Sequence, residues 1–169
     1  MNPIHPTKAQ VMFVLLRAIV WATLFVAYGL VFLPSWLLRN TGLTPPSAIG
    51  PAQVAGAVVV VGGGCLVVWA ILTFVFAGKG TPAPFDPPRR LVVTGPFRFV
   101  RNPIYVGAVA AMAGAALYFR SWALLAYDAA IAVIFHVLVR SYEEAVLRRT
   151  FGADYDAYCD RVPRWPGSR

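Results

Sequence analysis

Charged residues are scarce in this chain, since they make up only 13% of its 169 residues, whereas soluble globular domains carry about 25%. Apolar residues make up 59%, against roughly 45–50% in such domains. This imbalance excludes a water-soluble monomer. It also excludes intrinsic disorder, which requires few apolar residues and many charges. The length allows a single domain.

Cysteine and histidine are also rare, with two residues of each. Cys65 falls in an apolar block and Cys159 in the charged C-terminal tail, so a disulfide between them would require two different environments to meet. With His5 and His136 as the imidazoles, the chain offers too few nitrogen and sulfur ligands for a zinc centre. The sequence therefore predicts neither a disulfide nor a metal site.

The apolar residues are gathered in long blocks. Residues 11–33 contain one charge and residues 54–76 contain none; about 20 apolar residues span a bilayer as a helix. Pro34 is predicted to begin the outer loop between these two helices. Two shorter blocks follow at 104–119 and 121–139. We predict an all-α membrane protein of about four transmembrane helices, the third and fourth a tight hairpin, with a cytoplasmic amphipathic C-terminal helix and tail. The third block gives only about 24 Å of helix, so this pair either spans or re-enters.

Positive charge is distributed unevenly across this predicted topology. Of 15 Lys and Arg residues, 12 flank the helices on one side, whereas Arg39 and Arg120 lie on the other and Arg17 lies inside the first block. Cytoplasmic flanks retain Lys and Arg, so both termini and the connection between the second and third helices are predicted to be cytoplasmic. The positive charge would meet anionic headgroups there. No nucleic-acid partner is predicted, because the apolar blocks are so long.

Three ionisable residues, Asp128, Arg17 and His136, and two sets of small residues lie inside the blocks. His136, within one turn of the interface, is interpreted as a hydrogen-bonded packing residue. A charge at Asp128 is costly unless it is paired or neutralised, and both a structural pairing, for example with Arg17, and a substrate role are open. Arg17 itself is interpreted as reaching the cytoplasmic interface. The glycines at 62–64 are interpreted as positions where another helix packs closely, as are the small residues at 107, 111 and 115.

The pattern changes from apolar to amphipathic after the fourth block. If that helix continues to Thr150, then His136, Arg140, Glu143 and Leu147 fall on one face. Such a stripe of an imidazole, a guanidinium and a carboxylate at the membrane boundary either binds a polar molecule or is a solvated face.

Two polar stretches in the C-terminal half carry the residue types of a binding site. The first, residues 94–107, contains two arginines, an amide and a phenol within eight positions. The second, residues 143–166, contains paired glutamates, two tyrosines and two arginines near its end. The predicted topology places both stretches on the cytoplasmic side, where they would form one pocket.

These stretches resemble the C-terminal signature of the integral-membrane methyltransferases, the superfamily of isoprenylcysteine carboxyl methyltransferase and phospholipid methyltransferase. The resemblance covers about residues 91–166 and no part of the first two helices. It rests on Gly95-Pro96-Phe97, Arg101-Asn102-Pro103-Ile104-Tyr105-Val106-Gly107, Glu143-Glu144, Phe151-Gly152 with Tyr155 and Tyr158, and Val162-Pro163-Arg164. Asn102 stands where the family usually has histidine, a version that resembles the phospholipid amine branch, and asparagine cannot act as a base near neutral pH.

The length and the apolar blocks predict one integral membrane domain over residues 1–169, with two helices in 1–90. The resemblance implies a methyltransferase-like half in 91–169. The resemblance also implies S-adenosylmethionine as cofactor. It implies membrane lipids as partners and a lipophilic or lipidated acceptor that arrives laterally through the bilayer. The candidate catalytic residues are Arg101, Asn102, Glu143 and Glu144. The candidate cofactor-binding residues, from the resemblance and the helix face together, are Arg98, Arg101, Asn102, Pro103, Tyr105, Gly107, His136, Arg140, Glu143, Glu144, Tyr155, Tyr158 and Arg164.

The acceptor decides which residues are needed. The carboxylate of a prenylcysteine-like compound is ionised at pH 7 and needs only a cation such as Arg101 or Arg98. A phospholipid amine must instead lose its proton, to Glu143, Glu144 or His136. A small four-helix transporter, an NADPH-dependent membrane reductase and a structural membrane partner are alternatives. The oligomeric state is not predicted.

Overall fold

A computed structural model describes residues 26–41, 46–78 and 90–168. Over these ranges the protein is helical and has no strand, as the all-α prediction requires. The elements are η1 (Val26–Phe32), α2 (Leu33–Asn40), α3 (Pro51–Gly78), η2 (Gly95–Arg98), α4 (Pro103–Phe119), α5 (Trp122–Leu138), η3 (Val139–Glu143), α6 (Glu144–Phe151) and α7 (Ala153–Arg161). Most of the predicted first helix, with Arg17, lies outside the described residues.

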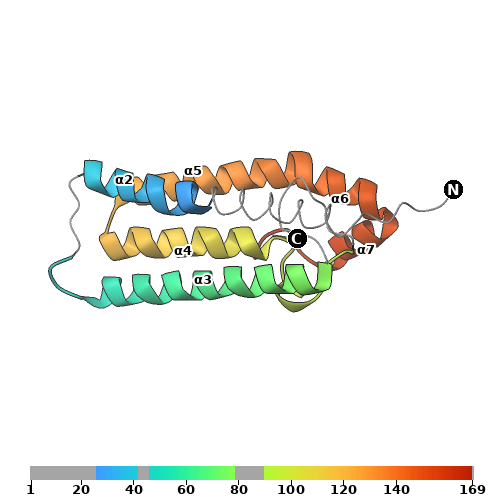
Figure 1. Ribbon diagram of the computed structural model, residues 1–169, viewed down its shortest axis with the longest axis horizontal. Helices are drawn as coiled ribbons and strands as arrows, with labels where there is room; N and C mark the ends of the chain where they lie inside the picture. The colour runs from blue at the N-terminus through green and yellow to red at the C-terminus, as the bar shows by residue number, and fades with distance from the viewer. Residues whose placement is uncertain (1–25, 42–45, 79–89, 169) are drawn as a thin grey trace, which may run out of the picture.

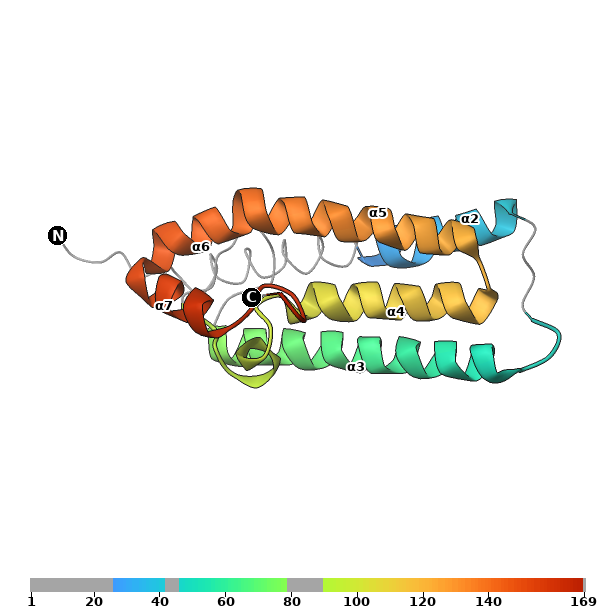
Figure 2. The same ribbon diagram turned by 180° about the vertical axis from the view of Figure 1, so that it is seen from behind.

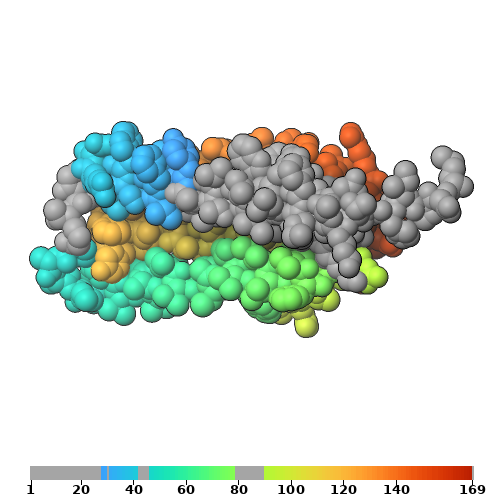
Figure 3. Space-filling view, viewed as in Figure 1, coloured from blue at the N-terminus to red at the C-terminus, as the bar shows by residue number. Residues whose placement is uncertain are grey.

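Three long helices define the shape of the molecule. α4 lies between α3 and α5, and successive helices run in opposite directions (Figures 1 and 2). α2 contacts α5 at the end where α4 joins α5. The space-filling view shows the resulting elongated body, with α3 along one edge (Figure 3).

Two of the described helices are long and apolar enough to cross a membrane. They are α3, with 28 residues, and the continuous helix Trp122–Phe151, with 30 residues; at about 1.5 Å per residue these exceed the roughly 30 Å of a hydrocarbon core. α4 is a shorter apolar helix of 17 residues. The number of four spans, and whether α4 and α5 form a membrane hairpin, stay predictions.

The helix ends follow from local sequence. Pro51 and Pro103 begin α3 and α4, where a missing N–H is tolerated and the fixed φ suits the first turn. α4 ends at Arg120, whose φ of 49° is left-handed. Ser121 then caps α5, since its Oγ accepts a hydrogen bond from Leu124 N at 3.2 Å. The connection between α4 and α5 is therefore only two residues long.

The predicted end of the first helix is wrong. The chain stays helical from the π-turn η1 through Pro34 to Asn40, so the following loop begins at Thr41 rather than at Pro34. Pro34 lies where the π-helix η1 changes to the α-helix α2, a point at which the regular i→i−4 hydrogen-bonding pattern is already interrupted.

Glycines bring α3 and α4 into backbone contact. A Cβ on Gly63 would lie 2.6 Å from Gly107 O, and one on Gly56 would lie 2.7 Å from Gly114 O. Gly62 and Gly64 have nothing within 4 Å of that position. The packing interpretation is thus confirmed for Gly63 and Gly107 and does not extend to the other two glycines of the triplet.

Asp128 faces the interior of the helix bundle. It is 4% exposed, and its Oδ1 has no hydrogen-bond partner among the described residues. The suggested partner, Arg17, lies outside the part of the chain that the structure describes, so that pairing stays a prediction.

Candidate functional site

A cavity opens where the end of α3, the loop before α4, and helices α6 and α7 come together. The chain turns back at Gly152, where φ is 53°, so α7 and the C-terminal tail (residues 162–168) return to the start of α4 (Figure 2). The lining residues are Phe74, Leu91, Val92, Phe97, Arg101, Asn102, Pro103, Ile104, Tyr105, Val139, Glu143, Glu144, Val146, Leu147, Tyr155 and Tyr158.

Apolar contacts hold the loop before α4 against both neighbours. Phe97 packs with Ala70 of α3, and Leu91 packs on the Tyr155 and Tyr158 side of α7. Gly95 has a φ of 56°, and a Cβ there would lie 2.7 Å from Thr73 Oγ1. Glycine is therefore required at this position both for its backbone angle and for the close approach to α3.

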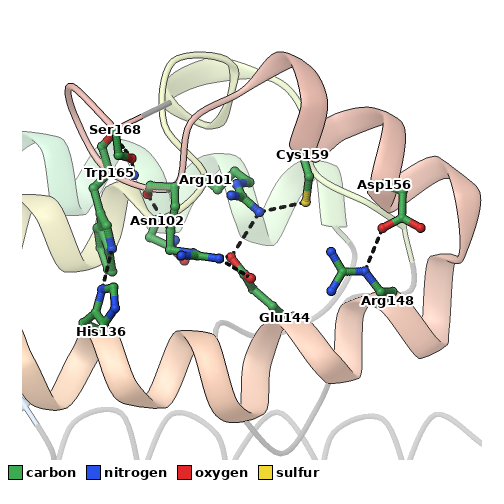
Figure 4. Close-up of polar contacts among 10 residues, drawn as sticks. Arg101, Asn102, His136, Glu144, Arg148, Asp156, Cys159, Trp165 and Ser168 are labelled. Atoms are coloured by element: carbon green, nitrogen blue, oxygen red, sulfur yellow. Dashed lines mark hydrogen bonds and ion pairs between the residues drawn. The ribbon is translucent and has the colours of Figure 1, made fainter.

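Glu144 is the centre of a buried ion cluster (Figure 4). Arg164 donates to it with two nitrogens, Nε to Oε1 at 2.6 Å and Nη2 to Oε2 at 2.7 Å. Arg101 Nη1 lies 3.0 Å from the same Oε1. The side chains of Glu144 and Arg101 are 8% and 12% exposed. Such a two-point guanidinium pair fixes geometry as well as charge, and the bond to Glu144 raises the pKa of Arg164.

Backbone contacts join the two polar stretches directly. Arg101 N donates to Pro163 O at 2.9 Å, and Asn102 Nδ2 donates to Arg164 O at 3.3 Å. Together with the ion cluster, these bonds hold the C-terminal tail against the loop before α4. The expectation that residues 94–107 and 143–166 meet is therefore confirmed.

Glu143 has different surroundings from its neighbour. It accepts a short hydrogen bond from the phenol of Tyr105, and no described cation pairs with it. The ring of Tyr105 packs on Phe135, with ring centroids 4.5 Å apart. Glu143 is thus a half-buried carboxylate whose charge is not balanced by any of the described cations.

The two tyrosines of α7 form the far wall of the cavity. Both are buried, and the phenol of Tyr158 donates to Phe97 O at 2.7 Å. Burial raises the pKa of both phenols. They therefore stay protonated at neutral pH and serve as hydrogen-bond donors and apolar walls.

The structure brings most of the predicted site residues together. Arg101, Asn102, Pro103, Tyr105, Glu143, Glu144, Tyr155 and Tyr158 all line the cavity. Arg164 does not line the cavity itself but forms an ion pair with Glu144, which does. Four others, Arg98, Gly107, His136 and Arg140, do not line the cavity. Arg98 places its guanidinium 5.1 Å from the ring of Phe99, and Gly107 packs against α3.

The expected single face from His136 to Leu147 is not formed. The helix does continue past Thr150, but a π-turn over Val139–Glu143 inserts an extra residue and rotates the register. Arg140 is exposed, and His136 Nδ1 instead accepts from Trp165 Nε1 at 3.0 Å (Figure 4). π-turns within α-helices are frequent at functional sites.

Cys159 contacts the ion cluster but is not among the residues predicted for the site. Its Sγ accepts from Arg101 Nη1 at 2.7 Å. The spacing of Tyr155, Tyr158, Cys159 and Val162 puts them on one face of a helix, and this periodicity is the signal that could have shown Cys159 to face the site rather than solvent.

Comparison with known proteins gives one match. A family model described as phospholipid methyltransferase matches residues 51–154, which is more than half of the chain. The matched region includes α3, where no signature was recognised, and it ends before Tyr155 and Arg164. Neither the curated proteins nor the solved structures contain a match.

Proposed function

The chain belongs to the phospholipid methyltransferase family, and from this premise we propose that it transfers the methyl group of S-adenosylmethionine to the amine of a membrane lipid. Family membership implies methyltransferase activity on a lipid-like acceptor. The helices long enough to cross a bilayer agree with a membrane protein.

The polar groups of the cavity fit the cofactor, which carries a carboxylate, an amine, hydroxyls and an adenine ring. Arg101 Nε is buried and has no hydrogen-bond partner among the described residues, so it is available to a carboxylate. Glu144 Oε2 accepts one bond, from Arg164, and retains a lone pair for an amine or hydroxyl. Phe97 and Leu147 supply apolar wall for the ring.

Methyl transfer of this kind depends on alignment and on exclusion of water. When bound, S-adenosylmethionine supplies a methyl group on a positively charged sulfur that leaves as a neutral thioether. Holding two reactants in line contributes up to roughly 7–11 kcal/mol in favourable cases. The ion cluster of Arg101, Glu144 and Arg164 suits this task, because it joins the loop, α6 and the tail around one cavity.

The different charge partners of Glu143 and Glu144 favour an amine over a carboxylate as the acceptor. Glu144 is balanced by two guanidiniums, whereas Glu143 has only a neutral phenol as its described partner. An uncompensated carboxylate attracts a cationic ammonium and repels a carboxylate. Arg101, the guanidinium that lines the cavity, pairs with Glu144 through Nη1, and its remaining Nε is assigned to the carboxylate of the cofactor, so a carboxylate acceptor has a weaker complement.

Glu143 is also placed to receive the proton that the amine must lose. Glu143 would accept the ammonium proton, which would free the nitrogen lone pair to take the methyl group as the methyl–sulfur bond breaks. The phenol of Tyr105 orients the carboxylate. His136 is not positioned for this role, because its Nδ1 already accepts from Trp165 and it does not line the cavity.

The distribution of arginines supports a cytoplasmic site. The end of the molecule that holds the cavity carries Arg101, Arg148, Arg149, Arg161 and Arg164. The opposite end carries Arg39 and Arg120 (Figure 1). Since cytoplasmic flanks are the ones rich in arginine, we place the cavity and the C-terminus on the cytoplasmic face.

The proposal is tested with purified protein in vesicles that contain dioleoyl phosphatidylethanolamine and S-adenosylmethionine with a deuterated methyl group. Mass spectrometry of the extracted lipid is expected to show the label on the headgroup nitrogen. Parallel vesicles with a farnesylated cysteine test the carboxylate. Label on the carboxylate alone would contradict the amine, and the absence of cofactor binding in a direct titration would contradict the cofactor.

A further inference from the structure

A second cavity runs along the contact between α4 and α5, and its walls are almost entirely apolar. On the outer side of α4 and α5 it is lined by Val106, Val109, Ala110, Ala132 and Val133. The helical spacing of these residues puts each set on one face, and the two alanines leave the hollow between the helices. We call this cavity the α4–α5 groove.

The groove and the polar cavity adjoin at one residue. Tyr105 lines both, with its phenol bonded to Glu143 on one side. A molecule that lies in the groove therefore has its end at Tyr105, next to the carboxylate assigned to the acceptor amine.

The C-terminal tail closes the polar end of the groove. Trp165 and Pro166 line it, and the Trp165 indole donates to His136 Nδ1 at 3.0 Å. The tail is held in this position by the ion pair of Arg164 with Glu144. The same segment thus borders both cavities.

We propose that the α4–α5 groove holds the first part of an acyl chain of the lipid acceptor and so presents its headgroup to Glu143. The inference rests on the proposed function. From Tyr105 to Ala110 the groove follows α4 for about 7.5 Å, which accommodates only the part of a chain nearest the headgroup. Val133, on its rim, is 62% exposed, so the rest of the chain continues into the surrounding bilayer.

The chemistry of the walls selects this occupant. None of the described lining residues is an acid, a lysine or an arginine. The His136 and Trp165 side chains already bond to one another. Burying a polar chain against such walls would leave its groups without partners. An acyl chain needs none.

The groove can be filled without touching the polar cavity. Ala110→Leu and Ala132→Leu add side chain within the groove, whereas Ala130→Leu adds the same atoms at an exposed position of α5. In mixed micelles we expect the KM for dioleoyl phosphatidylethanolamine, as a mole fraction, to rise at least about tenfold in the first two variants. The control variant should keep its KM, and the affinity for S-adenosylmethionine should be unchanged in all three.

A binding measurement separates this inference from the proposed function. Phosphatidylethanolamine with a diazirine near the carbonyl end of one acyl chain is cross-linked to the protein in nanodiscs. Label is expected on residues 106–110 and 132–133 and is expected to fall several-fold in Ala132→Leu but not in Ala130→Leu. If the wild-type protein methylates no lipid, the proposed function fails while this labelling still tests the groove.

Two results would overturn the groove assignment. One is an unchanged KM in both groove-filling variants while their cofactor affinity shows that they are folded. The other is labelling spread equally over exposed apolar residues such as Trp69 of α3 and unaffected by Ala132→Leu.

Discussion

Glu143 and Glu144 are chemically identical neighbours in sequence that the fold places in opposite electrostatic situations. Glu144 is 6% exposed and is held by two arginines. Glu143 faces the same cavity with a phenol as its described partner. One carboxylate therefore maintains the site and the other is available to a ligand.

This division predicts different outcomes for two isosteric substitutions. Glu143→Gln is expected to reduce methyl transfer by roughly 10²–10⁴-fold while leaving the unfolding temperature in detergent unchanged. Glu144→Gln leaves two guanidiniums facing one another and is expected to destabilise the protein by roughly 2–4 kcal/mol, below the value for a fully buried pair because Arg164 is partly exposed. Tryptophan fluorescence during unfolding and transfer assays measure the two effects.

The converse result would refute the assignment. Normal transfer in Glu143→Gln, with cofactor affinity unchanged, would show that this carboxylate takes no proton from the acceptor. Unchanged stability in Glu144→Gln would show that the ion cluster contributes nothing to folding.

Tyr105 is expected to act on the reaction through Glu143. Tyr105→Phe removes the phenol that bonds Glu143 but keeps the ring that packs on Phe135. We expect kcat to fall at least about tenfold, because hydrogen bonds to charged groups contribute about 1.5–3 kcal/mol and each 1.4 kcal/mol is about tenfold, with little change in the KM for lipid. Tyr118→Phe, at the far end of α4, is the matched control, and an equal loss in both variants would contradict the role.

Among the elements, the contact between α3 and α4 depends on glycine at particular positions. Gly63 and Gly107 each lie so close to the backbone of the other helix that no space is left for a Cβ atom. Close backbone approach of this kind is how helices associate in membranes, where the hydrophobic effect does not drive them together.

Gly63→Ala and Gly107→Ala are therefore expected to destabilise the protein by about 1–3 kcal/mol through overpacking. Gly62→Ala is the control, since nothing lies within 4 Å of its Cβ position, and it should be neutral or slightly stabilising because alanine favours helix. Unfolding in detergent measures all three. A loss of stability in the control equal to that in Gly63→Ala would argue against the close contact.

The ends of a helix could be predicted where a proline or a charged residue bounds an apolar block. The charge-free block 54–76 became α3 over Pro51–Gly78, and block 104–119 became α4 over Pro103–Phe119, because proline and charge bound each run. The π-turn over Val139–Glu143 was not predictable, since a change from i+4 to i+5 hydrogen bonding leaves no mark in the pattern of apolar residues. That turn is what separates His136 and Arg140 from Glu143.

The candidate site, like the helices, could be predicted only in part. That residues 94–107 and 143–166 meet could be predicted from the resemblance and the topology. Which glutamate pairs with arginine could not, because it depends on the rotation that the π-turn introduces. The contact of Cys159 with Arg101 depends on how α7 folds back after Gly152, which the periodicity within α7 does not describe.

On the scale of the whole molecule, charge is polarised along the long axis. The end that contains the cavity, α6 and α7 is rich in arginine, whereas the end with the connection between α4 and α5 carries few charges (Figure 1). A cofactor with a carboxylate and a lipid from the same leaflet can both reach the site only if that end faces the compartment that supplies the cofactor.

This polarity predicts which residues a membrane-impermeant maleimide reaches in intact cells. In a background of Cys65→Ser and Cys159→Ser, shown to bind cofactor, a cysteine at exposed Ser47 lies at the end of the molecule opposite the cavity, and one at exposed Thr150 lies beside it. We expect Ser47→Cys to be labelled in intact cells and Thr150→Cys only after permeabilisation, because the arginine-rich end is the one that we propose to lie in the cytoplasm. Labelling of Thr150→Cys in intact cells would place the cavity outside. A cytoplasmic cofactor could not then reach Glu144 and Arg101, and the proposed reaction would lose its methyl donor even though the fold is unchanged.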